Sequence, residues 1–90
     1  MTEPYGLIVF RSRQQALRME QELRSAGLRV RVVHTPHEAA AGCGLSVQFD
    51  LNDLKRVFSV YERVVPQSLV GFYRAEPEGT RLRCTPIRKV

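Results

Sequence analysis

The chain has 90 residues, of which 43% are hydrophobic and 26% are charged, and its formal net charge is +5 at pH 7. This length accommodates one domain with one core, and the composition excludes collagen-like repeats, a disulfide scaffold and a disordered chain. No apolar run approaches the roughly 20 residues of a membrane-spanning helix, and the N-terminus lacks a signal-peptide pattern, so we expect a cytoplasmic protein without a membrane partner.

The first half of the chain is predicted to form a strand, a helix and a strand. The continuous apolar run over residues 6–10 is typical of a buried strand. Ser12 and Gln15 form a capping box, apolar residues then recur at helical spacing, and Gly27 suits a helix stop. Residues 28–33 alternate between apolar residues and arginines, which predicts a half-exposed strand at a sheet edge.

A second strand, helix and strand follow. Alternation over residues 45–49 predicts a strand. Asp50 is typical of a helix N-cap, the apolar residues after it lie at i, i+3, i+4 and i+7, and Pro66 ends this helix. Residues 69–73 predict the last strand of this unit.

The order of these elements predicts an α+β fold. It favours a ferredoxin-like βαββαβ sandwich, in which a four-stranded antiparallel sheet carries two helices on one face. Two helices are too few to cover both faces of a parallel, doubly wound sheet. The strands over 28–33 and 45–49 should therefore be antiparallel.

The positive charge is concentrated at the C-terminal end. Residues 79–90 contain four basic residues and no acidic one: Arg81, Arg83, Arg88 and Lys89. Residues 1–78 contain 10 basic and 9 acidic residues and are therefore nearly neutral. We predict a domain over residues 1–74 and a basic C-terminal extension over residues 75–90, which is either flexible or adds a short strand through residues 81–84. Residues 79–90 are expected to be dispensable for folding and to contribute to partner binding, with nucleic acid as one alternative.

The loop between the second and third predicted strands carries the candidate chemistry. Residues 35–38 read Thr-Pro-His-Glu, a capping-box sequence that predicts a short helical turn. Cys43 then stands between Gly42 and Gly44, where the absence of side chains lets the backbone approach whatever binds the sulfur. On the residues alone, Cys43 is either a reactive thiol or a small buried hydrophobe.

This loop and its surroundings resemble a known family. The residues that carry the resemblance are a proline, a Cys-Gly-Leu run and a Phe-Asp pair: Pro36, Cys43, Gly44, Leu45, Phe49 and Asp50. With the preceding strand–helix–strand, they are similar to the bacterial Se/S carrier protein-like family over residues 6–74. His37 replaces an arginine that is usual there, and residues 39–42 lack the family's hydroxyl groups.

The resemblance implies that Cys43 carries sulfur or selenium as a persulfide or selenosulfide. The donor would be a cysteine or selenocysteine lyase-type enzyme, and an acceptor enzyme would receive the atom. A carrier of this kind fits a 90-residue chain with one candidate nucleophile better than an independent enzyme does. The resemblance implies no cofactor.

The thiolate of Cys43 needs positive charge nearby, because a model thiol titrates at a pH of about 8.5. In the predicted fold Cys43 lies where both helices end, and their negative dipole ends would disfavour a thiolate. Support is then expected from His37 and His34, from backbone amides around Gly42 and Gly44, or from arginines elsewhere: Arg24, Arg63 and Arg74.

Two alternatives involve the second cysteine. A zinc site would take ligands from the loop and the extension, although no Cys-x-x-Cys pair is present: His34, His37, Cys43 and Cys84. Alternatively, Cys84 would resolve a Cys43 intermediate as a disulfide.

Two further alternatives use the open face of the sheet. Arg29 and Arg31 would lie on that face and, with the basic extension, would suit RNA phosphates, although the aromatic stacking motif of common RNA-binding sheets is absent. The other is a small interaction module that associates through the same face, and a homodimer is a further alternative.

Overall fold

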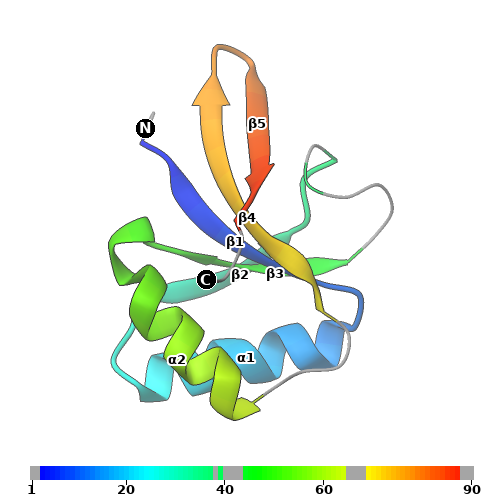
Figure 1. Cartoon of the computed structure of the whole chain (residues 1–90). Helices are drawn as coiled ribbons and strands as arrows, with labels where there is room; N and C mark the ends of the chain where they lie inside the picture. The colour runs from blue at the N-terminus through cyan, green and yellow to red at the C-terminus, as the bar shows by residue number, and fades with distance from the viewer. Residues whose placement is uncertain (1–2, 38, 40–43, 65–68, 88–90) are drawn as a thin grey trace.

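Two helices lie on one face of a five-stranded sheet, and the last two strands form a hairpin that extends beyond them (Figure 1). The computed structural model describes residues 3–37, 39, 44–64 and 69–87. Its elements in chain order are β1 Tyr5–Phe10, α1 Arg13–Ser25, β2 Val30–His34, β3 Leu45–Phe49, the 3-10 turn η1 Leu51–Asp53, α2 Leu54–Val64, β4 Leu69–Glu78 and β5 Arg81–Pro86.

The sheet has the strand order β2-β3-β1-β4-β5, and every neighbouring pair is antiparallel. The predicted α+β class is confirmed, and so is the antiparallel pairing of β2 with β3. The expected four-stranded, ferredoxin-like sheet is not confirmed, because β5 adds a fifth strand outside β4.

β4 is longer than its predicted span because Pro77 does not interrupt it. The backbone N–H of Ile87 donates to the carbonyl of Phe72, which sets the alternation of hydrogen-bonded pairs between β4 and β5. Pro77 then falls in a pair with Leu82 that exchanges no backbone hydrogen bonds. On the other side of β4, β1 begins only at Tyr5, opposite Ala75, so Pro77 has no partner in β1 and its missing N–H removes no bond from the sheet.

Both helices begin at predicted caps. The hydroxyl of Ser12 accepts the backbone N–H of Gln15, and α1 ends before Gly27, whose positive φ of 85° suits glycine. The carboxylate of Asp50 accepts the N–H of Asn52, so this cap begins η1, and α2 continues from it. No helix in the described part of the chain is long and apolar enough to cross a membrane.

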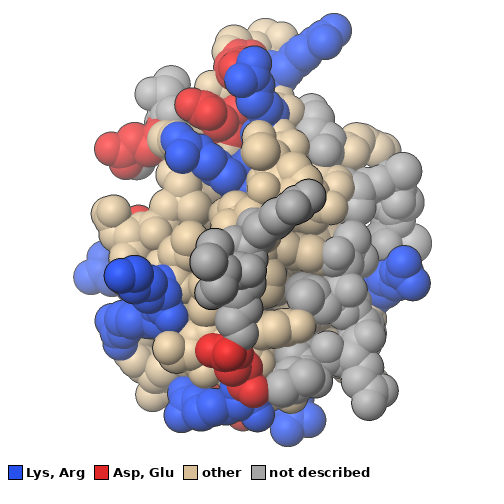
Figure 2. All heavy atoms as spheres, in the orientation of Figure 1, with Lys and Arg blue, Asp and Glu red and all other residues tan. Residues whose placement is uncertain are grey.

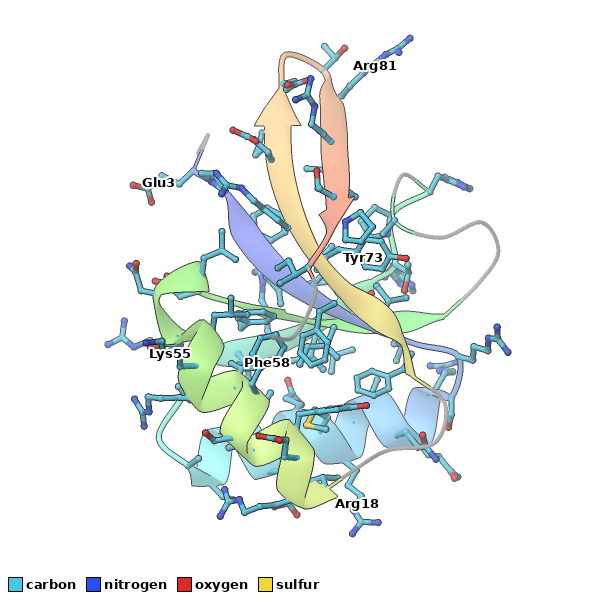
Figure 3. The ribbon with its side chains drawn as sticks, in the orientation of Figure 1. Glu3, Arg18, Lys55, Phe58, Tyr73 and Arg81 are labelled. Atoms are coloured by element: carbon cyan, nitrogen blue, oxygen red, sulfur yellow. The ribbon has the colours of Figure 1, made fainter. Side chains whose placement is uncertain are left out.

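The main core lies between the helices and the sheet. It contains thirteen buried residues from the strands, both helices and the segment before β2, with fully enclosed Ile8, Met19 and Val57 among them. Phe58 of α2 points toward the sheet and meets the ring of Phe72 edge-on at a centroid distance of 4.7 Å (Figure 3). This face therefore has a continuous helical cover.

The opposite face, which we call the far face, has a smaller cluster. Leu7, Val9 and Ala75 are buried there together with Ala39 from the loop after β2. Half-buried residues of the strands complete this far-face cluster: Tyr5, Val33, Tyr73, Leu82 and Cys84.

The outer edge of β2 is covered by two side chains of α1. The carboxylate of Glu20 accepts the backbone N–H of Val32 at 3.2 Å, and Arg24 donates to the carbonyl of Val30 at 3.1 Å. Glu20 and Arg24 are also paired with each other at 3.3 Å. These two backbone groups of the sheet edge are therefore satisfied from within the chain.

Candidate functional site

The loop between β2 and β3 is closed at its base by hydrogen bonds. The backbone N–H of Thr35 donates to the carbonyl of Gly44 at 3.2 Å. The hydroxyl oxygens of Thr35 and Ser46 lie 2.8 Å apart, and Ser46 is fully buried. These contacts hold the two ends of segment 36–43 side by side, so the predicted cysteine loop leaves the sheet and returns to it at one place.

Gly44 lies against the backbone of β1. A Cβ atom at this position would come within 2.6 Å of the carbonyl oxygen of Phe10, which no side chain tolerates without movement of the backbone. The sequence predicted that glycine here permits a close approach. The group that approaches is the main chain of β1, and the predicted role of Gly44 in binding a ligand stays a prediction.

The end of the sheet next to this loop, here called the loop end, is also where α1 begins. Phe10, Leu45 and His34 are aligned across β1, β3 and β2 at this end. Ser12 caps α1 only two residues after Phe10. The expectation that both helices end here is therefore wrong for α1, because antiparallel pairing of β1 with β3 brings the residues after β1 to the start of β3.

The electrostatic field at the loop end is therefore more positive than the sequence predicted. The N-terminus of α1 carries a partial positive charge, its first turn contains no acidic residue, and Arg11 and Arg13 beside it are exposed. Only α2 runs the other way and ends near this end, with Arg63 in its last turn. The net field of these described groups favours an anion more than the sequence had indicated.

The predicted site residues are described only in part. Cys43 and Gly42 lie outside the described residues. His34 is the last residue of β2 and His37 lies in the turn that follows, and both are exposed. Neither imidazole has a hydrogen bond or an ion pair with another described residue.

Two of the arginines considered as electrostatic support lie elsewhere. Arg24 contacts Val30, at the end of β2 away from the loop, and Arg74 is paired in register with Gly6, at the corresponding end of β1. The zinc alternative gains nothing here, because no group of three His, Cys, Asp or Glu side chains that could hold a metal ion occurs among the described residues.

The loop also reaches the far face, where the second cysteine lies. Ala39 donates its N–H to the carbonyl of Pro36 at 3.1 Å, which closes a turn in the segment where a short helical turn was predicted. Its methyl group is buried in the far-face cluster, against which Cys84 also packs. A described part of the cysteine loop and Cys84 therefore share one apolar cluster.

Sequence reasoning missed Thr35 and Ser46 at the base of the loop, and Arg11 and Arg13 at the start of α1. The arginines follow directly from antiparallel pairing of β1 with β3, which the predicted fold already contained. The hydroxyl pair had no comparable signal, because a Thr and a Ser eleven positions apart carry no local pattern.

Comparison with known proteins gives one result. The family described as Putative Se/S carrier protein-like matches residues 5–66. The chain belongs to this family. The matched residues run from β1 through α2 and include the whole cysteine loop, whereas β4 and β5 lie beyond them. No curated protein and no solved structure matches the chain.

Proposed function

We propose that this chain is a sulfur or selenium carrier that holds the transferred atom on Cys43 and passes it between two enzymes. The observation that carries this proposal is membership of the Se/S carrier protein-like family over residues 5–66. Cys43 is the only cysteine within the matched residues, since the other, Cys84, lies after them. A thiol is the protein group that forms a persulfide or a selenosulfide, so Cys43 is the natural carrier atom.

The proposed loading step is an exchange at sulfur. The Cys43 thiolate attacks the terminal sulfur of a persulfide on the donor enzyme, a new S–S bond forms, and the donor's own cysteine leaves as a thiolate. Cys43 then bears the persulfide. A selenosulfide on the donor delivers selenium in the same way, and a nucleophile of the acceptor enzyme removes the terminal atom and restores the Cys43 thiolate.

Three features of the described residues support an anionic, accessible sulfur at this place. Gly44, bonded to Cys43, is held against β1, and Thr35 fixes the base of the loop. The positive end of α1 lies at the same end of the sheet. His37 and His34 are exposed near the base of the loop, where protonation of either would favour a thiolate.

The proposed partners are a cysteine or selenocysteine lyase-type donor and an acceptor enzyme. We also propose a cytoplasmic location, because a thiol that must react repeatedly needs a compartment that keeps thiols reduced. We also propose that the basic extension takes part in docking. Its charge is balanced in part within the hairpin, because Arg83 is paired with Glu78 at 3.0 Å, and Figure 2 shows acidic and basic side chains interleaved at the protruding tip. Arg88 and Lys89 lie outside the described residues.

The test is transfer from a cysteine or selenocysteine lyase, followed by intact-mass measurement without reductant. The wild-type chain should gain one sulfur or one selenium atom. Cys43→Ala should gain none, and the matched variant Cys84→Ala should gain as much as the wild type. Loss of the adduct in His37→Gln, with Cys43 present, would assign His37 to electrostatic support.

Two results would contradict the proposal. One is the absence of any adduct on the wild type together with alkylation of Cys43 no faster than a model thiol, which would make Cys43 a packing residue. The other is recovery of stoichiometric zinc that is lost in Cys43→Ala, which would favour the metal alternative.

A further inference from the structure

A hollow with its own polar lining lies at the opposite end of the sheet from the cysteine loop. Its volume is about 760 Å³, within the range of small-molecule sites. Polar residues and one aromatic residue from β1, β2, β3 and η1, and from the positions just before β2 and η1, line it: Tyr5, Arg29, Arg31, Gln48, Asp50 and Asn52. It is open to solvent and does not include any residue of the proposed carrier site.

Two guanidinium groups of this hollow have no partner among the described residues. Arg31 lies in β2 directly opposite Gln48 of β3, and Arg29 comes just before β2 and lines the same hollow. Both side chains are exposed, and neither guanidinium makes an ion pair or a hydrogen bond within the described part of the chain. Arginine binds phosphate through two parallel N–H donors, so two adjacent arginines without partners favour a phosphate ligand.

The remaining lining suits a planar, polar group next to that phosphate. Tyr5 offers an aromatic ring, and the amides of Gln48 and Asn52 offer both donors and acceptors, which is how proteins read unstacked bases. Two carboxylates, those of Glu3 and Asp50, line the same hollow. Their repulsion disfavours a polyphosphate and leaves a single phosphate between the arginines as the better match.

We propose that this hollow binds a nucleoside monophosphate, either as a free nucleotide or as one unit of a single-stranded nucleic acid. The phosphate lies between Arg29 and Arg31, and the base lies against Tyr5 with its edge toward Gln48. This proposal is independent of Cys43. It also differs from binding through the basic extension, because its phosphate ligands come from the edge of the sheet.

The test compares matched arginine variants. Fluorescence anisotropy with labelled single-stranded oligo-U and oligo-A should show binding that Arg31→Ala weakens by about tenfold, with a lower slope of affinity against salt. Arg18→Ala removes an exposed arginine of α1 on the helical side and should leave binding unchanged (Figure 3). Far-ultraviolet circular dichroism checks that all variants fold.

Free UMP and AMP distinguish the two sources of the ligand. Amide NMR shifts at Arg31 and Gln48 on titration with either nucleotide, and displacement of the oligonucleotide, would assign the site to a free nucleotide. Binding of the oligonucleotide without displacement would assign it to a strand.

Four results would overturn the proposal. They are the absence of binding to both nucleotides and oligonucleotides at low salt, equal weakening by Arg18→Ala, equal affinity for duplex RNA, and equal displacement by a hexaglutamate peptide. Equal displacement by hexaglutamate would show that the surface binds any anion, including an acidic protein segment.

Discussion

Ile8 and Leu7 are adjacent in β1 and both are fully excluded from solvent, yet they belong to different cores. Ile8 lies under two helices, in a cluster of thirteen buried residues. Leu7 lies on the far face, in a cluster of four, beneath a loop residue and half-buried side chains of the hairpin. Two equally buried residues are therefore covered in different ways. Helices cover Ile8, whereas hairpin side chains and the loop that leads to the proposed carrier cysteine cover Leu7.

This difference teaches that the candidate loop takes part in the packing of the domain. Ala39 is the described residue through which it does so. A change on the far face is thus expected to reach the loop, whereas a change of similar size under the helices should affect stability alone.

The largest expected effect tests the two covers directly. Ile8→Ala should lower the free energy of unfolding by about 4 kcal/mol, because packed helices cannot close the space left behind. Leu7→Ala should lower it by about 2 kcal/mol, because a loop and half-buried side chains can settle into the cavity. Urea unfolding of both variants measures the difference, and equal losses would show that the two faces are equally rigid.

Removal of the hairpin's second strand should have the next largest effect. Truncation after Glu78 removes β5 with Leu82, which packs on the far face, and Ile87, which packs on the main core. We expect a loss of about 2–3 kcal/mol from their half-buried side chains. The sequence-based prediction that residues 79–90 are dispensable for folding gives the opposite expectation. It requires an unchanged urea midpoint in the truncated chain, so the same measurement decides between the two.

The hydroxyl pair at the base of the loop sharpens the comparison further. Thr35→Val leaves the buried hydroxyl of Ser46 without its partner and should cost about 1–2 kcal/mol. The double variant with Ser46→Ala should cost less than the sum of the two single changes, since it removes both polar groups. Urea unfolding of the four proteins measures this coupling, and strict additivity would show that the hydrogen bond contributes nothing.

The smallest effect is expected at the second cysteine. Cys84→Ala removes a half-buried sulfur from the far-face cluster and should cost about 0.8 kcal/mol, comparable to one methylene group. Thermal unfolding should show a fall in Tm of about 4 °C. A loss as large as that of Leu7→Ala would mean that Cys84 is a principal support of this face, and the variant would then be a poor control for the transfer experiment.

Local patterns predicted local structure well and failed where distant segments meet. The Ser12 cap of α1 and the alternation in β3 are properties of a few neighbouring residues, and both were predicted. The extension was predicted to begin at residue 75, whereas β4 continues through Pro77. Proline is tolerated there because β1 reaches no further than the position opposite Ala75, which no local pattern reveals. The burial of Ala39 likewise depends on strands elsewhere in the chain, and alanine has no side-chain pattern that reveals it.

The ion pair of Glu20 and Arg24 also bears on aggregation, because both side chains bond to the outer edge of β2. An outer strand with open backbone groups can recruit a strand from another molecule, and such recruitment is the first step of fibril growth. By occupying Val32 N–H and Val30 C=O, α1 withdraws this edge from that reaction. For the proposed carrier, this cover would allow repeated encounters with a donor and an acceptor without the β2 edge becoming trapped in a shared sheet.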